Sequence, residues 1–102
     1  MRAFEIKHVR GTLLTALGSY SPNGLSGRNI LAHVLRPVFP GLTKQECFQH
    51  LTYLKDRGLV DYVKESGIRE ITDPMELVYR LTPDGLDIAT GVTQDPTILV
   101  EA

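Results

Sequence analysis

Apolar residues recur at helical spacing in three segments of the first half of the chain. In residues 6–20 they form one stripe, made of Ile6, Val9, Leu13, Leu14 and Leu17. A repeat of three or four positions predicts an amphipathic helix over this segment. The sequence Ser21-Pro22-Asn23-Gly24 follows it and predicts a turn, because proline and Asn-Gly favour tight turns.

A second helix is predicted over residues 27–35. Ser26 precedes it and is a favoured N-cap residue. The helix is expected to end at Arg36, because the residue before Pro37 is pushed away from the α conformation. Its apolar face consists of Ile30, Leu31, Val34 and Leu35.

A third helix is predicted from Thr43 to about Arg57. Thr43 and Glu46 have the spacing of a capping box, and Gly58 suits the left-handed residue that closes many helices. The core stripe of this helix consists of Cys47, Leu51 and Leu54, with Phe48 at its edge.

The periodicity then changes from helical to alternating. Residues 59–64 alternate and are rich in β-branched residues, which predicts a strand. Residues 65–67 are a turn signal and residues 68–74 a long hairpin tip. The returning strand is predicted over residues 75–81, with Met75, Leu77, Tyr79 and Leu81 on one face.

A short last helix is predicted over residues 84–90, with Thr82 as its cap, Pro83 at its first position and Gly91 after its end. Residues 92–102 form a C-terminal tail whose β-prone end has no evident partner. We therefore predict one α+β domain in residues 1–91, with three helices, a two-stranded hairpin and a short helix. The residues expected in its core include Leu13, Leu17, Ile30, Val34, Leu51, Leu54, Val60 and Leu81.

Two motifs resemble parts of bacterial winged-helix regulators. Leu51-Thr-Tyr-Leu-Lys-Asp-Arg-Gly-Leu-Val60 is similar to the end of a recognition helix and the entry to the wing. Arg80-Leu-Thr-Pro-Asp-Gly-Leu86 is similar to the turn that leaves the wing. Over Val9–Ala89 the chain resembles small winged-helix proteins of Mu-like phages and prophages. The resemblance implies a winged helix-turn-helix domain that binds double-stranded DNA or regulates transcription, with residues 44–57 as its recognition helix.

The same resemblance implies that the third helix enters the major groove and that the wing contacts the DNA backbone or the minor groove. Glutamine pairs with adenine, whereas lysine bonds guanine or phosphate. Arg2, Lys7 and Arg10 are further candidates for phosphate contacts. The predicted DNA-binding residues are Lys44, Gln45, Phe48, Gln49, Thr52 and Lys55 on the third helix, Arg28 on the second, and Lys64 and Arg69 on the wing.

Charge is distributed unevenly, although the net charge is only -1. Residues 1–58 hold eight Lys or Arg against three Asp or Glu, and residues 59–102 hold three against nine. The excess of cations in the first half therefore favours binding to a polyanion. The predicted wing does not, because its two cations face five carboxylates, on Asp61, Glu65, Glu70, Asp73 and Glu76.

Two further features oppose DNA binding. Phe48 and Gln49 are uncharged where winged-helix regulators often carry arginine, and the sequence pI of about 6.3 is low for a nucleic-acid binder. A second hypothesis is therefore a protein–protein interaction or homodimerisation module without DNA binding. Phe48, Tyr53 and Tyr62 favour it, because aromatic residues are enriched in interfaces.

Catalytic and metal sites are not predicted. Cys47 and His50 lie three residues apart, but zinc needs three or four ligands, so we expect Cys47 in the core. No phosphate-binding loop or nucleophile elbow occurs, which predicts a protein that is not an enzyme and has no cofactor. One cysteine, no signal peptide and no apolar stretch of membrane-spanning length predict a cytoplasmic protein without a membrane partner.

Overall fold

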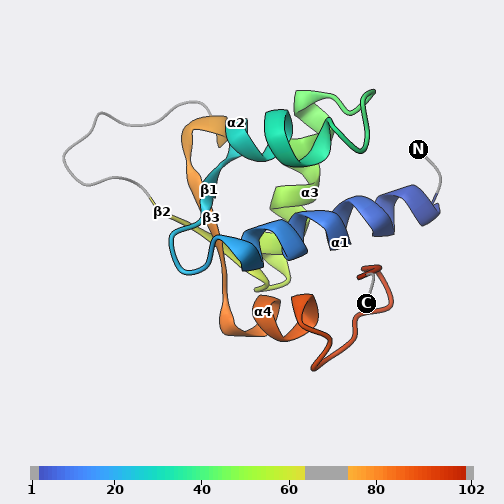
Figure 1. Ribbon diagram of the computed structural model, residues 1–102, viewed down its shortest axis with the longest axis vertical. Coiled ribbons are helices and arrows are strands. Elements are labelled where there is room, and N and C mark those ends of the chain that lie inside the picture. The colour runs from blue at the N-terminus through green and yellow to red at the C-terminus, as the bar shows by residue number, and fades with distance from the viewer. Residues whose placement is uncertain (1–2, 64–73, 101–102) are drawn as a thin grey trace.

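Four α-helices and a three-stranded antiparallel sheet make up the part of the chain that the computed structural model describes, residues 3–63 and 74–100. In chain order the elements are α1 (Ala3–Ser19), β1 (Leu25–Ser26), α2 (Gly27–Asn29), the π-helical turn η1 (Ile30–Leu35), α3 (Lys44–Asp56), β2 (Val60–Val63), the 3-10 turn η2 (Pro74–Glu76), β3 (Val78–Leu81) and α4 (Pro83–Ala89). Helix α1 lies between η1 and α4, and α3 crosses behind it (Figure 1).

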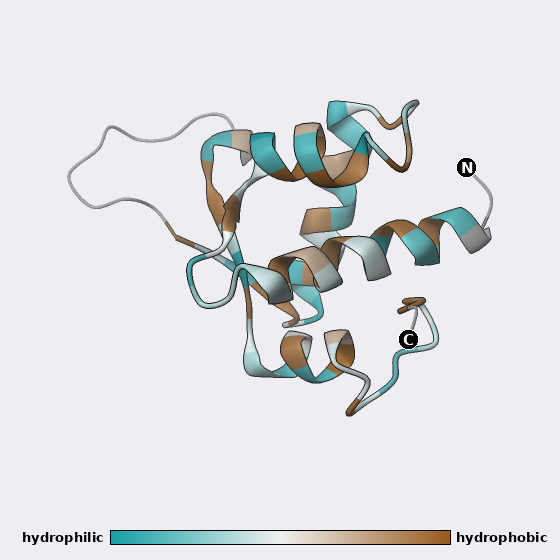
Figure 2. Cartoon of the chain, viewed as in Figure 1, coloured by the Kyte–Doolittle hydropathy of each residue, from teal (hydrophilic) through white to brown (hydrophobic). Residues whose placement is uncertain are grey.

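The core forms where the apolar faces of the helices meet. Val9, Leu13, Leu14 and Leu17 of α1 are fully buried, as the predicted stripe requires. Figure 2 shows the apolar residues of η1 on the side that faces α1. Together with α3 and α4, these faces enclose one cluster of buried side chains. No helix within the described ranges is long and apolar enough to cross a membrane.

The second helical segment differs from its prediction in its winding. Ser26 caps it as predicted, because its hydroxyl accepts the Asn29 N–H at 3.2 Å. Residues 30–35, however, are π-helical, and the Arg36 N–H donates to the Leu31 carbonyl, five residues back. A π turn holds more residues than an α turn, so the apolar stripe rotates along the segment. Val34, predicted to be buried, is consequently only partly buried.

Helix α3 begins and ends where the sequence predicts. The Thr43 hydroxyl accepts the Glu46 N–H at 3.1 Å, and the Glu46 carboxylate accepts the Thr43 N–H at 3.0 Å. This capping box closes the N-terminus of the helix, and Gly58, with φ of 74°, follows its C-terminus. Cys47, Leu51 and Leu54 are fully buried, which confirms the predicted core stripe.

The sheet contains the predicted β-hairpin, formed by β2 and β3, and a third strand that was not predicted, in the order β1-β3-β2. Strands β2 and β3 pair antiparallel, and β1 pairs with the other edge of β3. β1 was not predicted, because a strand of two residues is too short to show an alternation of apolar and polar positions. The predicted turn at 65–67 and residues 68–73 of the predicted hairpin tip lie outside the described residues, and Pro74, the last residue of that tip, begins η2.

The returning strand is shorter than predicted. It begins at Val78, because residues 74–76 form η2 and the Gly27 N–H donates to the Leu77 carbonyl at 3.0 Å. Met75 is buried, whereas Leu81, predicted in the core, is partly buried. The segment therefore joins the start of α2 to the sheet instead of extending the hairpin.

The C-terminal segment after α4 packs back onto α1. Thr82 caps α4 as predicted, with its hydroxyl accepting the Gly85 N–H at 3.1 Å. Beyond α4, Ile98 is buried and the Leu99 N–H donates to the Lys7 carbonyl at 3.0 Å. The tail that had no evident partner in the sequence thus contributes to the same core as α1 (Figure 1).

Candidate nucleic-acid interface

Helix α3 directs its side chains to three sides. One side is the buried stripe already described. The second, which we call the outward face, is exposed along the whole helix, because the stripe turns the opposite side chains to solvent. It carries every α3 residue predicted from the sequence to contact DNA: Lys44, Gln45, Phe48, Gln49, Thr52 and Lys55.

The outward face has an ordered arrangement along the helix axis. Gln45 and Gln49 lie one turn apart, and Thr52 follows at the next turn. Lys44 is at the first position of the helix and Lys55 in its last turn. The Lys55 ammonium also lies 5.0 Å from the centre of the Tyr62 ring, which orients it beside strand β2. Asp56 is the exposed carboxylate at the C-terminal end of this face.

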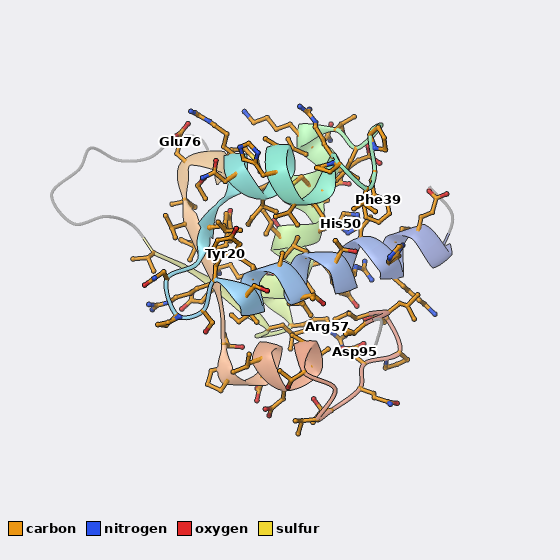
Figure 3. The ribbon with its side chains drawn as sticks, in the orientation of Figure 1. Tyr20, Phe39, His50, Arg57, Glu76 and Asp95 are labelled. Atoms are coloured by element: carbon orange, nitrogen blue, oxygen red, sulfur yellow. The ribbon has the colours of Figure 1, made fainter. Side chains whose placement is uncertain are left out.

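The predicted phosphate contact Arg28 already has a partner. Its guanidinium pairs with the carboxylate of Glu76 in η2, which lies beside α2 (Figure 3). The two side chains are 70% and 45% exposed, so water screens the pair and its net strength is small. Arg28 is therefore accessible to an anion but shares its charge with an acidic residue. Lys64 and Arg69, the predicted wing contacts, lie outside the described residues.

The third side of α3 faces the C-terminal segment. We call the cluster there the C-terminal clamp; its members are Arg10, Tyr53, Arg57, Asp95 and Thr97. The guanidinium carbons of Arg10 and Arg57 lie 3.6 Å and 5.5 Å from the centre of the Tyr53 ring. Arg57 forms an ion pair with Asp95 (Figure 3), and the Tyr53 hydroxyl donates to the Thr97 hydroxyl at 2.7 Å. The structure therefore places Arg10, one of the predicted phosphate contacts, against the tail.

The ion pair in the clamp stabilises the charged forms of both Asp95 and Arg57. Burial raises the pKa of Asp95, but hydrogen bonds from Thr97 and Arg57 outweigh burial and hold the pKa below its ordinary value. The same contact raises the pKa of Arg57. This side of α3 therefore carries charges that already have partners inside the protein.

Two ionisable residues on α3 lie against the core. Burial raises the pKa of Cys47 to about 11, so the thiol stays protonated and is a poor nucleophile. Burial, with the nearby charge of Arg10, lowers the pKa of His50 and favours its neutral form. Within the described ranges, no three His, Cys, Asp or Glu side chains gather into a group that would hold a metal ion.

A groove of about 730 Å³ lies between the end of α4 and the tail. Its lining comes from residues 88–100 and is mostly small or apolar. The carboxylate in it, on Asp95, is engaged by Arg57 and Thr97. The groove thus lacks the convergent polar groups that orient a small ligand, and the outward face of α3 is the stronger candidate site.

Comparisons with known proteins give no relative. No family model, no curated protein and no solved structure matches the chain.

The clamp is the feature that sequence reasoning missed. A local signal for part of it exists, because aspartate often accepts the N–H two residues ahead, and Asp95 accepts the Thr97 N–H at 2.8 Å. The ion pair with Arg57, 38 residues away, leaves no such signal in the sequence.

Proposed function

We propose that the chain is a winged-helix DNA-binding domain whose helix α3 lies in the major groove. The order of three helices and a β-hairpin supports the winged-helix interpretation. The observation that carries the proposal is the outward face of α3, which presents amide, hydroxyl and aromatic side chains to solvent between two lysines. These are groups that bond base edges and phosphates.

Few cationic side chains are available to contact phosphates beside the outward face of α3. Arg10 and Arg57 bond within the clamp, and Lys7 lies beside the tail. The phosphate contacts that we assign to the described residues are therefore Lys44, Lys55 and Arg28. With roughly three phosphates neutralised, log K falls against log salt with a slope of roughly -3. Binding is therefore expected to be modest and clearly dependent on salt.

A fluorescence anisotropy titration tests the proposal. The wild-type chain is titrated with a random-sequence duplex at about 50 mM and about 200 mM salt, where phosphate contacts differ strongly in strength. Lys44→Ala is expected to weaken binding to every duplex and to reduce the salt slope by about 1. Lys7→Ala is the control. The sequence also makes Lys7 a candidate phosphate contact, but the Lys7 carbonyl accepts the Leu99 N–H, so this exposed lysine lies beside the tail and its loss is expected to leave the salt slope unchanged.

The wild-type result decides the proposal. If the chain fails to bind any duplex at about 50 mM salt, the DNA-binding function is wrong. Equal effects of the Lys44 and Lys7 substitutions would instead show that binding does not use α3.

A protein-interaction surface is the second candidate function. Phe48, 38% exposed on the outward face, favours it, because aromatic side chains are enriched in interfaces. The exposed carboxylates of Asp61 and Glu76 also tolerate a protein partner better than a phosphate backbone. Cross-linking of the wild-type chain and the Phe48→Ala variant tests this function. If the substitution changes DNA affinity but leaves every protein cross-link unchanged, the protein-interaction function is wrong.

A further inference from the structure

We propose that the outward face of α3 selects A·T base pairs in the major groove. The inference rests on the proposed DNA-binding function and adds the class of target sequence to it. Three observations carry it: the spacing of two glutamines, the exposed aromatic ring of Phe48, and the absence of arginine from α3.

The spacing of Gln45 and Gln49 matches the spacing of base pairs. Residues four apart on an α-helix are about 6 Å apart along the axis. Two base-pair steps of about 3.4 Å cover nearly the same distance. Both glutamines are exposed on one side of α3, so a helix that follows the groove presents them to two base pairs two steps apart.

The amide group is complementary to adenine. A glutamine amide has an NH₂ donor and a carbonyl acceptor. The major-groove edge of adenine offers the N7 acceptor and the N6 donor, so one amide forms two hydrogen bonds with it. Guanine offers two acceptors at the same edge, which leaves the amide carbonyl without a donor.

Phe48 adds a contact for thymine. Its ring is 38% exposed on the edge of the outward face and lies between the two glutamines in sequence. Phenylalanine makes apolar contact with the C5-methyl group of thymine, which cytosine lacks. Thr52 is exposed one turn further along and carries a methyl group that can make a contact of the same type.

Side chains that read G·C pairs lie only at the two ends of the outward face. α3 contains no arginine, the residue whose fork bonds guanine best. Glu46, a candidate for the cytosine amino group, is held in the capping box by Thr43. Lys44 and Lys55 each offer a single point charge to guanine or phosphate, and the Asp56 carboxylate is an acceptor for cytosine, but these residues lie in the first and last turns of the helix. The two glutamines and Phe48, which lie between them along the helix, therefore outweigh them.

Four duplexes of equal length and charge test the inference. The first is A·T-rich and the second G·C-rich. The third replaces adenine in the first by 7-deazaadenine, which removes the N7 acceptor, and the fourth replaces thymine by uracil, which removes the methyl group. Anisotropy at about 50 mM salt is expected to show at least roughly tenfold tighter binding of the A·T-rich duplex than of the G·C-rich one. The 7-deazaadenine duplex loses most of this advantage.

Variants assign the preference to side chains. Gln45→Ala and Gln49→Ala are expected to lower the A·T to G·C affinity ratio several-fold and to leave affinity for the G·C-rich duplex unchanged. Phe48→Ala is expected to reduce the difference in affinity between the thymine and uracil duplexes, and Thr52 accounts for any difference that remains. Gln94→Ala is the matched control, because Gln94 is an exposed glutamine in the loop after α4. Thermal unfolding of each variant checks that the fold is retained.

The outcomes separate this inference from the function on which it rests. Salt-dependent binding with equal affinity for the A·T-rich and G·C-rich duplexes overturns the base preference and leaves DNA binding in place. A preference that survives both glutamine substitutions and 7-deazaadenine comes from duplex shape, which overturns the assignment to α3 side chains. Failure to bind any of the duplexes overturns the DNA-binding function and this inference with it.

Discussion

The outward face and the clamp side of α3 belong to one helix and use their polar residues in opposite ways. On the clamp side, Tyr53 and Arg57 bond residues of the tail that are about forty positions away in the chain. On the outward face, Gln45, Gln49 and Thr52 lie in solvent. Polar groups that bond within the fold stabilise it, whereas polar groups displayed in a row on an exposed helix are available to another molecule.

The comparison also changes the meaning of the charge distribution. The first 58 residues carry an excess of cations, which in the sequence favours a polyanion partner. Two of these cations, Arg10 and Arg57, stack on Tyr53 and bond the tail instead. Charge counted along a sequence therefore overstates the charge that a binding face presents.

The largest expected effect comes from Gly11→Ala, which disturbs only the clamp side. A Cβ built on Gly11 would overlap the Leu99 carbonyl. Because the Leu99 carbonyl belongs to the backbone, it cannot move aside as a flexible side chain would. The tail must therefore move away and expose Ile98, which lowers the free energy of unfolding by about 1.5–3 kcal/mol. The higher helix propensity of alanine offsets about 1 kcal/mol of this loss. We expect a net loss of about 1–3 kcal/mol in the free energy of unfolding once the clamp contacts are included.

Urea unfolding and hydrogen exchange of the Leu99 amide measure this effect. Gly41→Ala is the control, because a Cβ at Gly41 has nothing within 4 Å, so we expect little change. A Gly11→Ala variant with wild-type stability and full protection at Leu99 would contradict the role assigned to the tail.

Local patterns in the sequence predict the helices and their caps well. The Thr43–Glu46 capping box and the Ser26 and Thr82 caps are present because their partners lie within three residues. The exposure of the α3 residues was predictable for a similar reason, since the buried stripe determines which side of a helix faces out.

The missed strand, the docked tail and the ion pairs all depend on contacts between distant residues. Strand β1 is two residues long and exists through its pairing with β3. The tail docks because Gly11 leaves room for the Leu99 backbone, and a glycine in a helix gives no sign of what will approach it. The Arg28–Glu76 pair likewise joins residues 48 positions apart. Such contacts require the fold before they can be recognised.

A smaller effect on the same side is expected from Asp95→Asn. The pKa of Asp95 is lowered in the folded state from an ordinary value of 3.8, so the carboxylate contributes stability that is fully present above that value. The contribution falls as the pH drops below 3.8 towards the folded pKa. The wild-type chain should therefore exceed the variant in stability by a constant amount above about pH 5 and by less below about pH 4.

Chemical unfolding over this pH range measures the difference, and a double-mutant cycle with Arg57→Gln isolates the ion pair. The effect of Asp95→Asn should shrink when Arg57 is already replaced. A difference between wild type and variant that stays constant down to about pH 2.5 would show that the pKa of Asp95 is not lowered by folding.

The smallest effect on stability is expected on the outward face, from Gln49→Ala. Gln49 is exposed in the middle of α3, and alanine has a slightly higher helix propensity than glutamine. We therefore expect the free energy of unfolding to stay within about 0.5 kcal/mol of wild type, as surface substitutions usually do. Urea unfolding measures it, beside the duplex titrations on the same sample. A loss of more than about 1 kcal/mol would mean that the Gln49 amide bonds within the protein, and the contrast between the two sides of α3 would then fail. With stability unchanged, any loss of A·T preference in this variant reports on a contact with DNA and not on the fold.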